Sequence, residues 1–118
     1  MKKTALFIGW NRSVAGRESA ALEHFAYAMN YLGKQKAAGS IDSFEPVVLQ
    51  SHGGDLNGFV LIQGNRDKVE AMMQTEEWRD IEVKSNMLLQ GHGIIRGFVG
   101  EDLQAEMARF GRLSQQIK

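Results

Sequence analysis

The stretch LNGFVLIQGNRDKVEAMMQTEEWRDI, residues 56–81, decides the fold that this sequence predicts. Residues 59–62 contain no polar side chain, which indicates a strand covered on both faces and therefore inside a sheet. Gly64 ends that strand, and Asn65 can cap the helix that follows. The helix shows apolar residues at helical spacing: Val69, Met72 and Met73. Thr75 can cap a further turn, in which Trp78 and Ile81 are expected to face inward.

The remaining segments supply further strands and a long helix. Residues 4–11 predict a strand that is apolar on both faces, and residues 17–38 predict the longest helix. The apolar face of that helix is expected to hold Leu22, Phe25, Ala26, Met29 and Leu32. Residues 41–50 predict an edge strand, because Pro46 has no amide hydrogen to donate to a neighbouring strand. The glycine pair in SHGGD, residues 51–55, predicts a tight hairpin.

The C-terminal third predicts one more strand and one more helix. Residues 87–99 are expected to form a glycine-punctuated strand in which His92, Ile94, Arg96 and Phe98 share one face. After Glu101 and Asp102, an amphipathic helix is expected with Leu103, Met107 and Phe110 on its apolar side. That helix is expected to dock on another surface and not to project freely.

Composition limits the classes of function. A chain of 118 residues with 43% hydrophobic residues predicts one domain, residues 1–118, with a core of its own. Lys+Arg and Asp+Glu number 14 each, so no basic surface for nucleic acid or an anionic membrane is expected. The absence of cysteine excludes a disulfide framework, a thiolate metal site and a cysteine nucleophile. It also fits a reducing compartment, and we expect a cytoplasmic protein.

The N-terminal segment superficially resembles a signal peptide. Its apolar part, residues 4–10, is only marginally long enough, and Asn11 and Arg12 interrupt it, so it is expected to be a strand. No segment reaches the length of a membrane span.

The order strand, helix, strand, strand, helix, strand predicts an α+β, ferredoxin-like antiparallel sheet with an added C-terminal helix. Right-handed crossovers place the first and third strands in the middle and the other two at the edges. Both helices then cover one face of the sheet, although the central strands are apolar on two faces. We therefore expect an obligate homodimer whose interface is the uncovered sheet face.

The chain resembles the dimeric α/β-barrel superfamily, and within it the small YCII-related and stress-responsive barrel proteins. The resemblance rests on LEHFAYAMNYL in the first helix, Gly39-Ser40-Ile41, GFVLIQG, NRDKVEAMM and the TEEW turn. It implies that two sheets pack face to face, with a cavity between sheet and helices. YCII-related proteins also carry a helix histidine near an aspartate that follows the helix, for which His24 and Asp42 are the comparable pair here. Their spacing is about one helical turn longer than in that pattern.

Three histidines are the candidates for acid and base chemistry: His24, His52 and His92. Since none is paired with another at HxH or HxxxH spacing, no metal site or other cofactor is expected. His24 lies in a stripe with Tyr27 and Tyr31 beside the apolar helix face, which fits either a polar helix edge or a catalytic residue. His52 fits either a turn or a loop over the mouth of a pocket. The sequence shows neither a phosphate-binding glycine loop nor a GxSxG motif.

His92 and Arg96 share a predicted strand face with apolar residues. A basic side chain there needs an acceptor, which is either a structural carboxylate or an anionic ligand. Arg96 in particular is expected to point into an enclosed space. The two residues are separated by about 13 Å along a strand, so they would mark two ends of one cavity. Trp10 on the first strand is a candidate aromatic wall for the same cavity.

Three functions remain open. The first is a homodimer that binds a small organic molecule through Trp10, His52, His92 and Arg96. The second is a cofactor-independent monooxygenase or isomerase, with His24 or His92 as the catalytic residue. The third is a structural or interaction module whose interior is filled by its own side chains.

Overall fold

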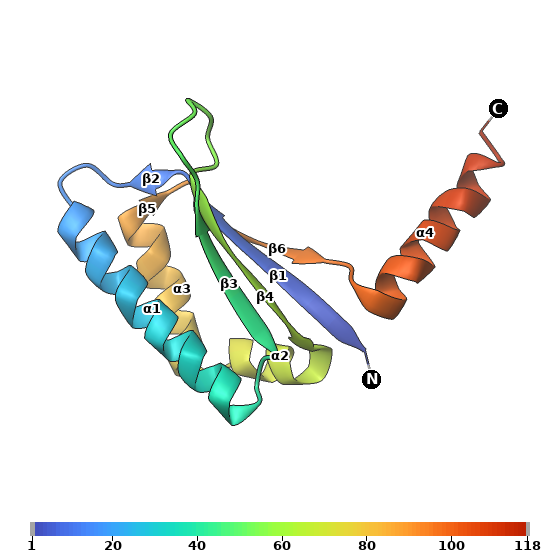
Figure 1. Ribbon diagram of the computed structural model, residues 1–118, viewed down its shortest axis with the longest axis horizontal. Coiled ribbons are helices and arrows are strands. Elements are labelled where there is room, and N and C mark those ends of the chain that lie inside the picture. The colour runs from blue at the N-terminus through green and yellow to red at the C-terminus, as the bar shows by residue number, and fades with distance from the viewer. Residues whose placement is uncertain (1, 118) are drawn as a thin grey trace.

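The computed structural model describes residues 2–117 and contains one four-stranded antiparallel sheet (Figure 1). The elements run in the order β1 (Lys3–Trp10), β2 (Arg12–Ser13), α1 (Glu18–Ala38), β3 (Ser43–Val48), β4 (Gly58–Asn65), α2 (Arg66–Met73), α3 (Glu76–Leu88), β5 (Leu89–Gln90), β6 (Gly93–Gly97) and α4 (Gly100–Ser114). The strand order in the sheet is β3-β4-β1-β6. The predicted ferredoxin-like order is confirmed, with β1 and β4 in the middle.

The central strands pair over their whole length, with Lys3 opposite Asn65 and Trp10 opposite Gly58. Pro46 lies on β3, at the edge of the sheet, where its missing amide costs no hydrogen bond within the sheet. Both predicted caps are present. Asn65 Oδ1 accepts a hydrogen bond from the amide of Lys68 at 3.0 Å, and Thr75 Oγ1 accepts one from the amide of Trp78 at 3.3 Å.

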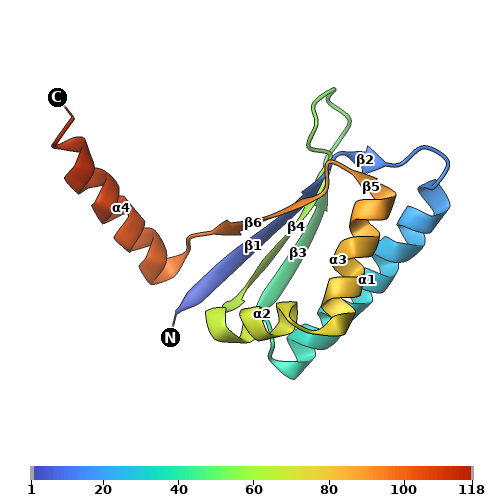
Figure 2. The same ribbon diagram turned by 180° about the vertical axis from the view of Figure 1, so that it is seen from behind.

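Helices α1 and α3 lie on one face of the sheet, as both ribbon views show (Figures 1 and 2). The core between the sheet and helices α1, α2 and α3 consists of Leu6, Tyr31, Leu32, Ile41, Val60, Ile62, Val69, Met72, Trp78 and Ile81. Leu6 and Ile62 face each other on β1 and β4 and are completely buried. The predicted inward placement of Trp78 and Ile81 is confirmed.

The buried face of α1 differs from the expected one. Its buried residues are Ala21, His24, Tyr31 and Leu32, while Leu22 is 72% exposed and Ala26 is exposed. The helix is rotated because His24 turns inward, where hydrogen bonds to α3 compensate for its burial. The expectation based on apolar residues alone was therefore wrong by part of a turn.

The expected strand over residues 87–99 is shorter than predicted. Met87 and Leu88 end α3, and Leu88 is buried. Leu89 and Gln90 then pair with β2, Gly91 turns the chain at a φ of 64°, and β6 begins only at Gly93. A left-handed φ of this kind favours glycine, which explains the change of direction at this point.

Helix α4 projects away from the body of the protein, so the expected docking of this helix is not seen within the single chain (Figures 1 and 2). None of its residues, all of which lie in the described range, is buried. Only its base is fixed, by ion pairs from Asp102 to Lys2 at 3.7 Å and to Arg66 at 3.3 Å.

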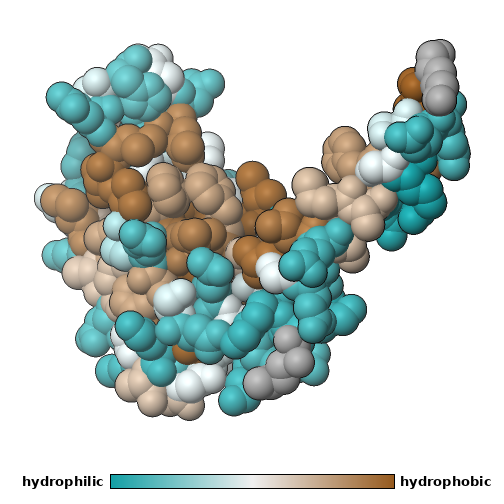
Figure 3. Space-filling view, turned by 45° about the vertical axis from the view of Figure 1, so that its right-hand side comes forward, coloured by the Kyte–Doolittle hydropathy of each residue, from teal (hydrophilic) through white to brown (hydrophobic). Residues whose placement is uncertain are grey.

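The sheet face opposite α1 and α3 stays uncovered in the single chain. Phe7 and Phe59 stack on it with ring centroids 4.9 Å apart, and Ile95 is 63% exposed. Figure 3 shows hydrophobic side chains exposed over the body and along the segment that leads to α4. None of the helices within residues 2–117 is long and apolar enough to cross a membrane.

Candidate functional site

A cavity of about 580 Å³ lies between the sheet and the helices α1 and α3. Its walls are mainly apolar and aromatic: Ile8 and Trp10 of β1, Ala21, Phe25 and Ala28 of α1, Val60 of β4, Trp78 and Ile81 of α3, and Ile94 of β6. The volume is within the range of pockets that hold small organic molecules.

Trp10 forms one wall, as expected from the sequence. Its indole lies against the backbone of Gly58, the residue opposite it on β4. The contact is so close that a Cβ at position 58 would fall 2.5 Å from Trp10 Cζ2. On the other side the ring meets Phe25 edge to face, with centroids 6.0 Å apart. The absence of a side chain at position 58 thus sets the position of Trp10.

His24 reaches the cavity from α1 and is anchored on α3. Its Nε2 lies 2.8 Å from Ser85 Oγ and 3.2 Å from the carbonyl oxygen of Ile81. A carbonyl oxygen only accepts, so Nε2 carries the hydrogen and Nδ1 keeps its lone pair in the neutral ring. Burial, and the nearby charge of Lys84, lower the pKa of His24, although the Ile81 carbonyl opposes this. The ring is therefore neutral near pH 7.

His92 lies on the same side of the sheet as Ile94 and also lines the cavity. Its Nδ1 is 2.8 Å from Asn86 Oδ1, an acceptor, so Nδ1 carries the hydrogen and Nε2 keeps the lone pair. Burial lowers the pKa of His92, against the opposing charge of Glu82. Adjacent residues of α3, Ser85 and Asn86, thus hold the two imidazoles in opposite tautomers.

Each of these rings retains one nitrogen without a protein donor. Within residues 2–117, no hydrogen bond reaches Nδ1 of His24 or Nε2 of His92. Trp78 Nε1 is the only fully buried side-chain nitrogen or oxygen within residues 2–117 that lacks a partner. Nδ1 of His24, which also lacks a partner, is therefore not fully buried. The polar groups offered by the two histidines are therefore acceptors.

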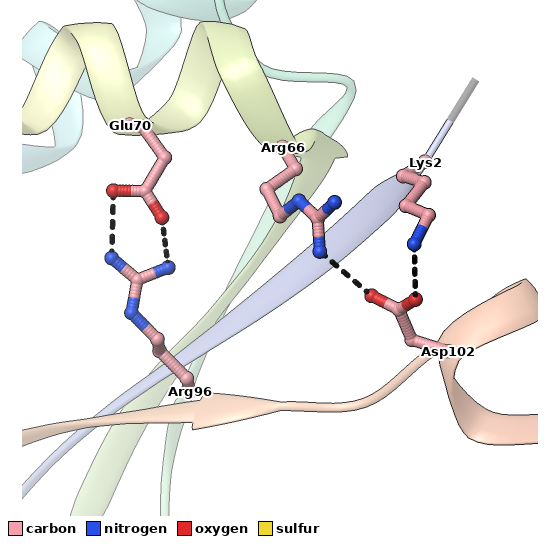
Figure 4. A network of polar contacts seen from close by, with 5 residues as sticks. All are labelled: Lys2, Arg66, Glu70, Arg96 and Asp102. Atoms are coloured by element: carbon pink, nitrogen blue, oxygen red, sulfur yellow. Dashed lines mark hydrogen bonds and ion pairs between the residues drawn. The ribbon is translucent and has the colours of Figure 1, made fainter. Parts of the chain in front are cut away.

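Arg96 lies outside the cavity lining, half-exposed under α2. Its guanidinium forms a two-point ion pair with Glu70, in which Nη2 donates to Oε2 at 2.8 Å and Nη1 contacts Oε1 (Figure 4). The hydrogen bond from Arg96 lowers the pKa of Glu70. The expected enclosure of Arg96 was wrong, because α2 brings a carboxylate over the end of this strand face. Of the two acceptors considered, the structural carboxylate is the one present.

The remaining candidates lie elsewhere. His52 is exposed in the loop between β3 and β4, where Nδ1 accepts from the amide of Gly54 at 3.2 Å and Nε2 donates to the carbonyl of Leu56 at 2.8 Å. Both of its nitrogens are used within the turn. Asp42 pairs with Lys3 at 2.5 Å, so the hydrogen bonds of His24 and Asp42 go to different partners. No cluster of three or more metal-binding side chains lies within residues 2–117.

Sequence patterns did not indicate the residues that anchor the histidines. Glu82, Ser85 and Asn86 lie between the predicted turn that ends near Ile81 and the predicted strand over residues 87–99. Only the continuation of α3 through Leu88 places them on one helix face. A signal was present in the sequence, since residues 82–88 contain no glycine or proline to end the helix that Thr75 caps.

No protein-family model matches the chain, and no curated protein sequence does. Solved structures match its fold. A dimeric protein of unknown function with a ferredoxin-like fold from Bacteroides fragilis superposes with a TM-score of 0.62 at 11% identity, over 82% of this chain and 96% of its own. A dimeric ferredoxin-like protein of unknown function from Thermobifida fusca gives 0.61 at 14% identity, over 84% and 93%.

A protein of the ethyl tert-butyl ether D family from Bacillus halodurans is similar to the same degree, with a TM-score of 0.59 at 10% identity over 83% of this chain and 99% of its own. At such identities the likeness shows the fold alone. This chain has a ferredoxin-like α+β fold, and the closer resemblance to YCII-related proteins stays a prediction.

Proposed function

We propose that this protein binds a small organic molecule in the cavity between its sheet and helices, and that the ligand carries a hydrogen-bond donor. The observation that carries the proposal is the neutral His24, whose Nδ1 keeps a lone pair beside a cavity of about 580 Å³. An apolar pocket with a few convergent polar groups is the usual form of a small-molecule site.

The class of ligand follows from the polar inventory. His24 and His92 both offer a lone pair rather than a hydrogen, and Trp10 and Phe25 supply flat aromatic walls. The hydroxyl of an aromatic or enolic compound donates to one of these acceptors, and its flat body can pack on the aromatic walls. At His24 and His92 a carboxylate oxygen would meet a lone pair, so a carboxylate fits these two positions less well than a phenol.

A second candidate function is proton transfer in a cofactor-independent monooxygenase or isomerase. Nδ1 of His24 favours this function. Because the pKa of His24 lies below its usual value, the imidazole is neutral at neutral pH and can accept a proton there. His24 is the catalytic residue of this candidate, and His92 is its alternative. The third possibility, a purely structural module, is disfavoured because the protein's own side chains leave the cavity open.

The proposed assembly is a homodimer formed through the uncovered sheet face. Phe7, Phe59 and Ile95 lie on that face, and exposed apolar patches of this kind mark interfaces. The dimeric state of the proteins from Bacteroides fragilis and Thermobifida fusca supports the same arrangement. The lack of cysteine supports a cytoplasmic location, and the matching element order supports the likeness to YCII-related barrels.

A matched pair of ligands tests the site. Phenols and their methyl ethers have nearly the same shape, but the ethers lack the donor. Calorimetric titration should show the wild type binding phenols about five-fold or more tightly than the ethers, since a hydrogen bond to a buried acceptor is worth about 1 kcal/mol or more. His24→Leu should remove this difference, and Ala28→Trp should block both ligands by filling the cavity. Equal binding of phenol and ether by the wild type would contradict the proposal.

A further inference from the structure

Helix α4 carries an apolar face that nothing covers within residues 2–117. Leu103, Met107, Phe110 and Leu113 recur at helical spacing and are 43%, 55%, 70% and 43% exposed. A helix with such a face is normally stabilised by packing that face against another surface. The single chain provides no such surface, because α4 points away from the body (Figure 1).

The direction of α4 is fixed at its base. Asp102 receives ion pairs from Lys2 beside β1 and from Arg66 at the start of α2, on opposite sides of its carboxylate (Figure 4). Asp102 is also the least exposed partner in both pairs, at 22%. The helix therefore leaves the sheet in a defined direction.

The surface area indicates how much is left to be covered. A monomer of 13.2 kDa is expected to expose about 6,400 Å², whereas this chain exposes 7892 Å². The excess, about 1,500 Å², is what one subunit buries in a sizeable permanent dimer. The radius of gyration, 16.5 Å, likewise exceeds the value of about 13.5 Å for a compact domain of this length.

We infer that α4 is an exchanged arm, which packs its apolar face on a second copy of this chain while the α4 of that copy packs on the first. The arm continues the uncovered sheet face, since the exposed Ile95 and Phe98 lead from β6 directly to α4. A two-fold axis through that face would carry each arm onto the partner. This inference rests on the proposed homodimer and adds the element that completes it.

The charges of α4 favour a protein surface over a membrane. A membrane-surface helix is rich in Lys and Arg on its polar face. In α4, Glu101, Asp102 and Glu106 outnumber Arg109 and Arg112. Glu106 and Arg109 also pair with each other at 3.6 Å, so the polar face is balanced.

The test compares two exposed positions of α4 in the full chain. Phe110→Glu places a charge on the apolar face, and Ala105→Glu places the same charge on the opposite side of the helix. Analytical ultracentrifugation should show Phe110→Glu weakening the dimer at least about ten-fold, with Ala105→Glu close to wild type. Circular dichroism and melting of both variants report whether the body stays folded, as expected for side chains that contact nothing buried in the single chain.

Crosslinking shows which chain the arm contacts. Because the protein has no cysteine, Met107→Cys can carry a single benzophenone label, and a dimer mixed from ¹⁵N and ¹⁴N chains distinguishes links between chains from links within one. Links between chains are expected. Links confined to one chain, or equal dimer affinity for Phe110→Glu and Ala105→Glu, would overturn the arm while leaving the sheet-face dimer standing. A monomeric wild type would overturn the dimer and the arm together.

Discussion

Ser85 Oγ lies 2.8 Å from Nε2 of His24 and itself donates to the Ile81 carbonyl at 2.7 Å. Because that hydroxyl hydrogen is already used, Ser85 accepts from the imidazole, and the carbonyl of Ile81 enforces the same tautomer. The orientation of the ring is thus determined twice, and its Nδ1 is left without a protein donor.

Replacement of Ser85 by alanine should cost stability without changing the tautomer. We expect Ser85→Ala to lower the free energy of unfolding by about 1 kcal/mol, the usual contribution of one hydrogen bond. The Ile81 carbonyl still holds Nε2–H, so the preference for phenols over methyl ethers should survive. Denaturant unfolding and calorimetry measure the two effects, and a lost preference would mean that Ser85 alone sets the tautomer.

Stability should fall on the acidic side of neutrality. Burial lowers the pKa of His24 and His92 below the unfolded value of 6.5, so between that value and the folded pKa the unfolded chain binds more protons. The stabilisation is complete above about pH 6.5 and declines as the pH falls through it. His24→Gln and His92→Gln should each flatten this part of the unfolding profile. If both variants keep a pH profile of unfolding as steep as that of the wild type, the loss of stability at acidic pH comes from other groups.

Arg96 should be structural rather than ligand-binding. The pair with Glu70 is half-exposed, so Arg96→Met should cost about 1 kcal/mol or less and leave the binding of phenols unchanged. Glu70→Gln should cost little further in the double variant, because the two residues act as one pair. Thermal melts in low and high salt would measure the stability cost of these variants. Loss of phenol binding in Arg96→Met would show instead that Arg96 contributes to the ligand site.

Met72 and Phe25 should respond differently to truncation. Met72 is buried in the core at 4% exposure, and Met72→Ala should cost about 2 to 5 kcal/mol. Phe25 is half-buried on the cavity wall, so Phe25→Ala should cost less and mainly enlarge the cavity. Denaturant melts together with binding of a bulkier phenol would separate the two, and equal destabilisation would contradict the placement of Phe25.

The sheet was predictable because its rules are local or topological. The uninterrupted apolar run in β4, the caps at Asn65 and Thr75, and the missing amide of Pro46 each act within a few residues, and handedness then determines the strand order. The sequence placed Trp10 and His92 correctly on the side of the sheet that faces the helices. Alternation along a strand is sufficient for such an assignment.

The site depended on partners distant in sequence. The sequence pattern placed His24 beside the apolar helix face and not on it. Its hydrogen-bond partner Ser85 lies 61 residues later, and a pattern of apolar residues within one helix carries no information about so distant a partner. Arg96 had the correct strand face, but the position of Glu70 on α2, 26 residues earlier, decided its environment. The outward course of α4 was equally hidden, since amphipathicity predicts that a helix packs without specifying the chain on which it packs.

A crystal of the protein soaked with a small phenol would show whether a phenol binds at His24. We predict that the phenol ring lies in the cavity against Trp10 and Phe25, with its hydroxyl oxygen about 2.7 to 3.2 Å from Nδ1 of His24. The same soak with Ala28→Trp should leave the cavity without ligand. A phenol bound in the cavity with its hydroxyl away from His24, or an empty cavity at saturating phenol, would contradict phenol binding at His24.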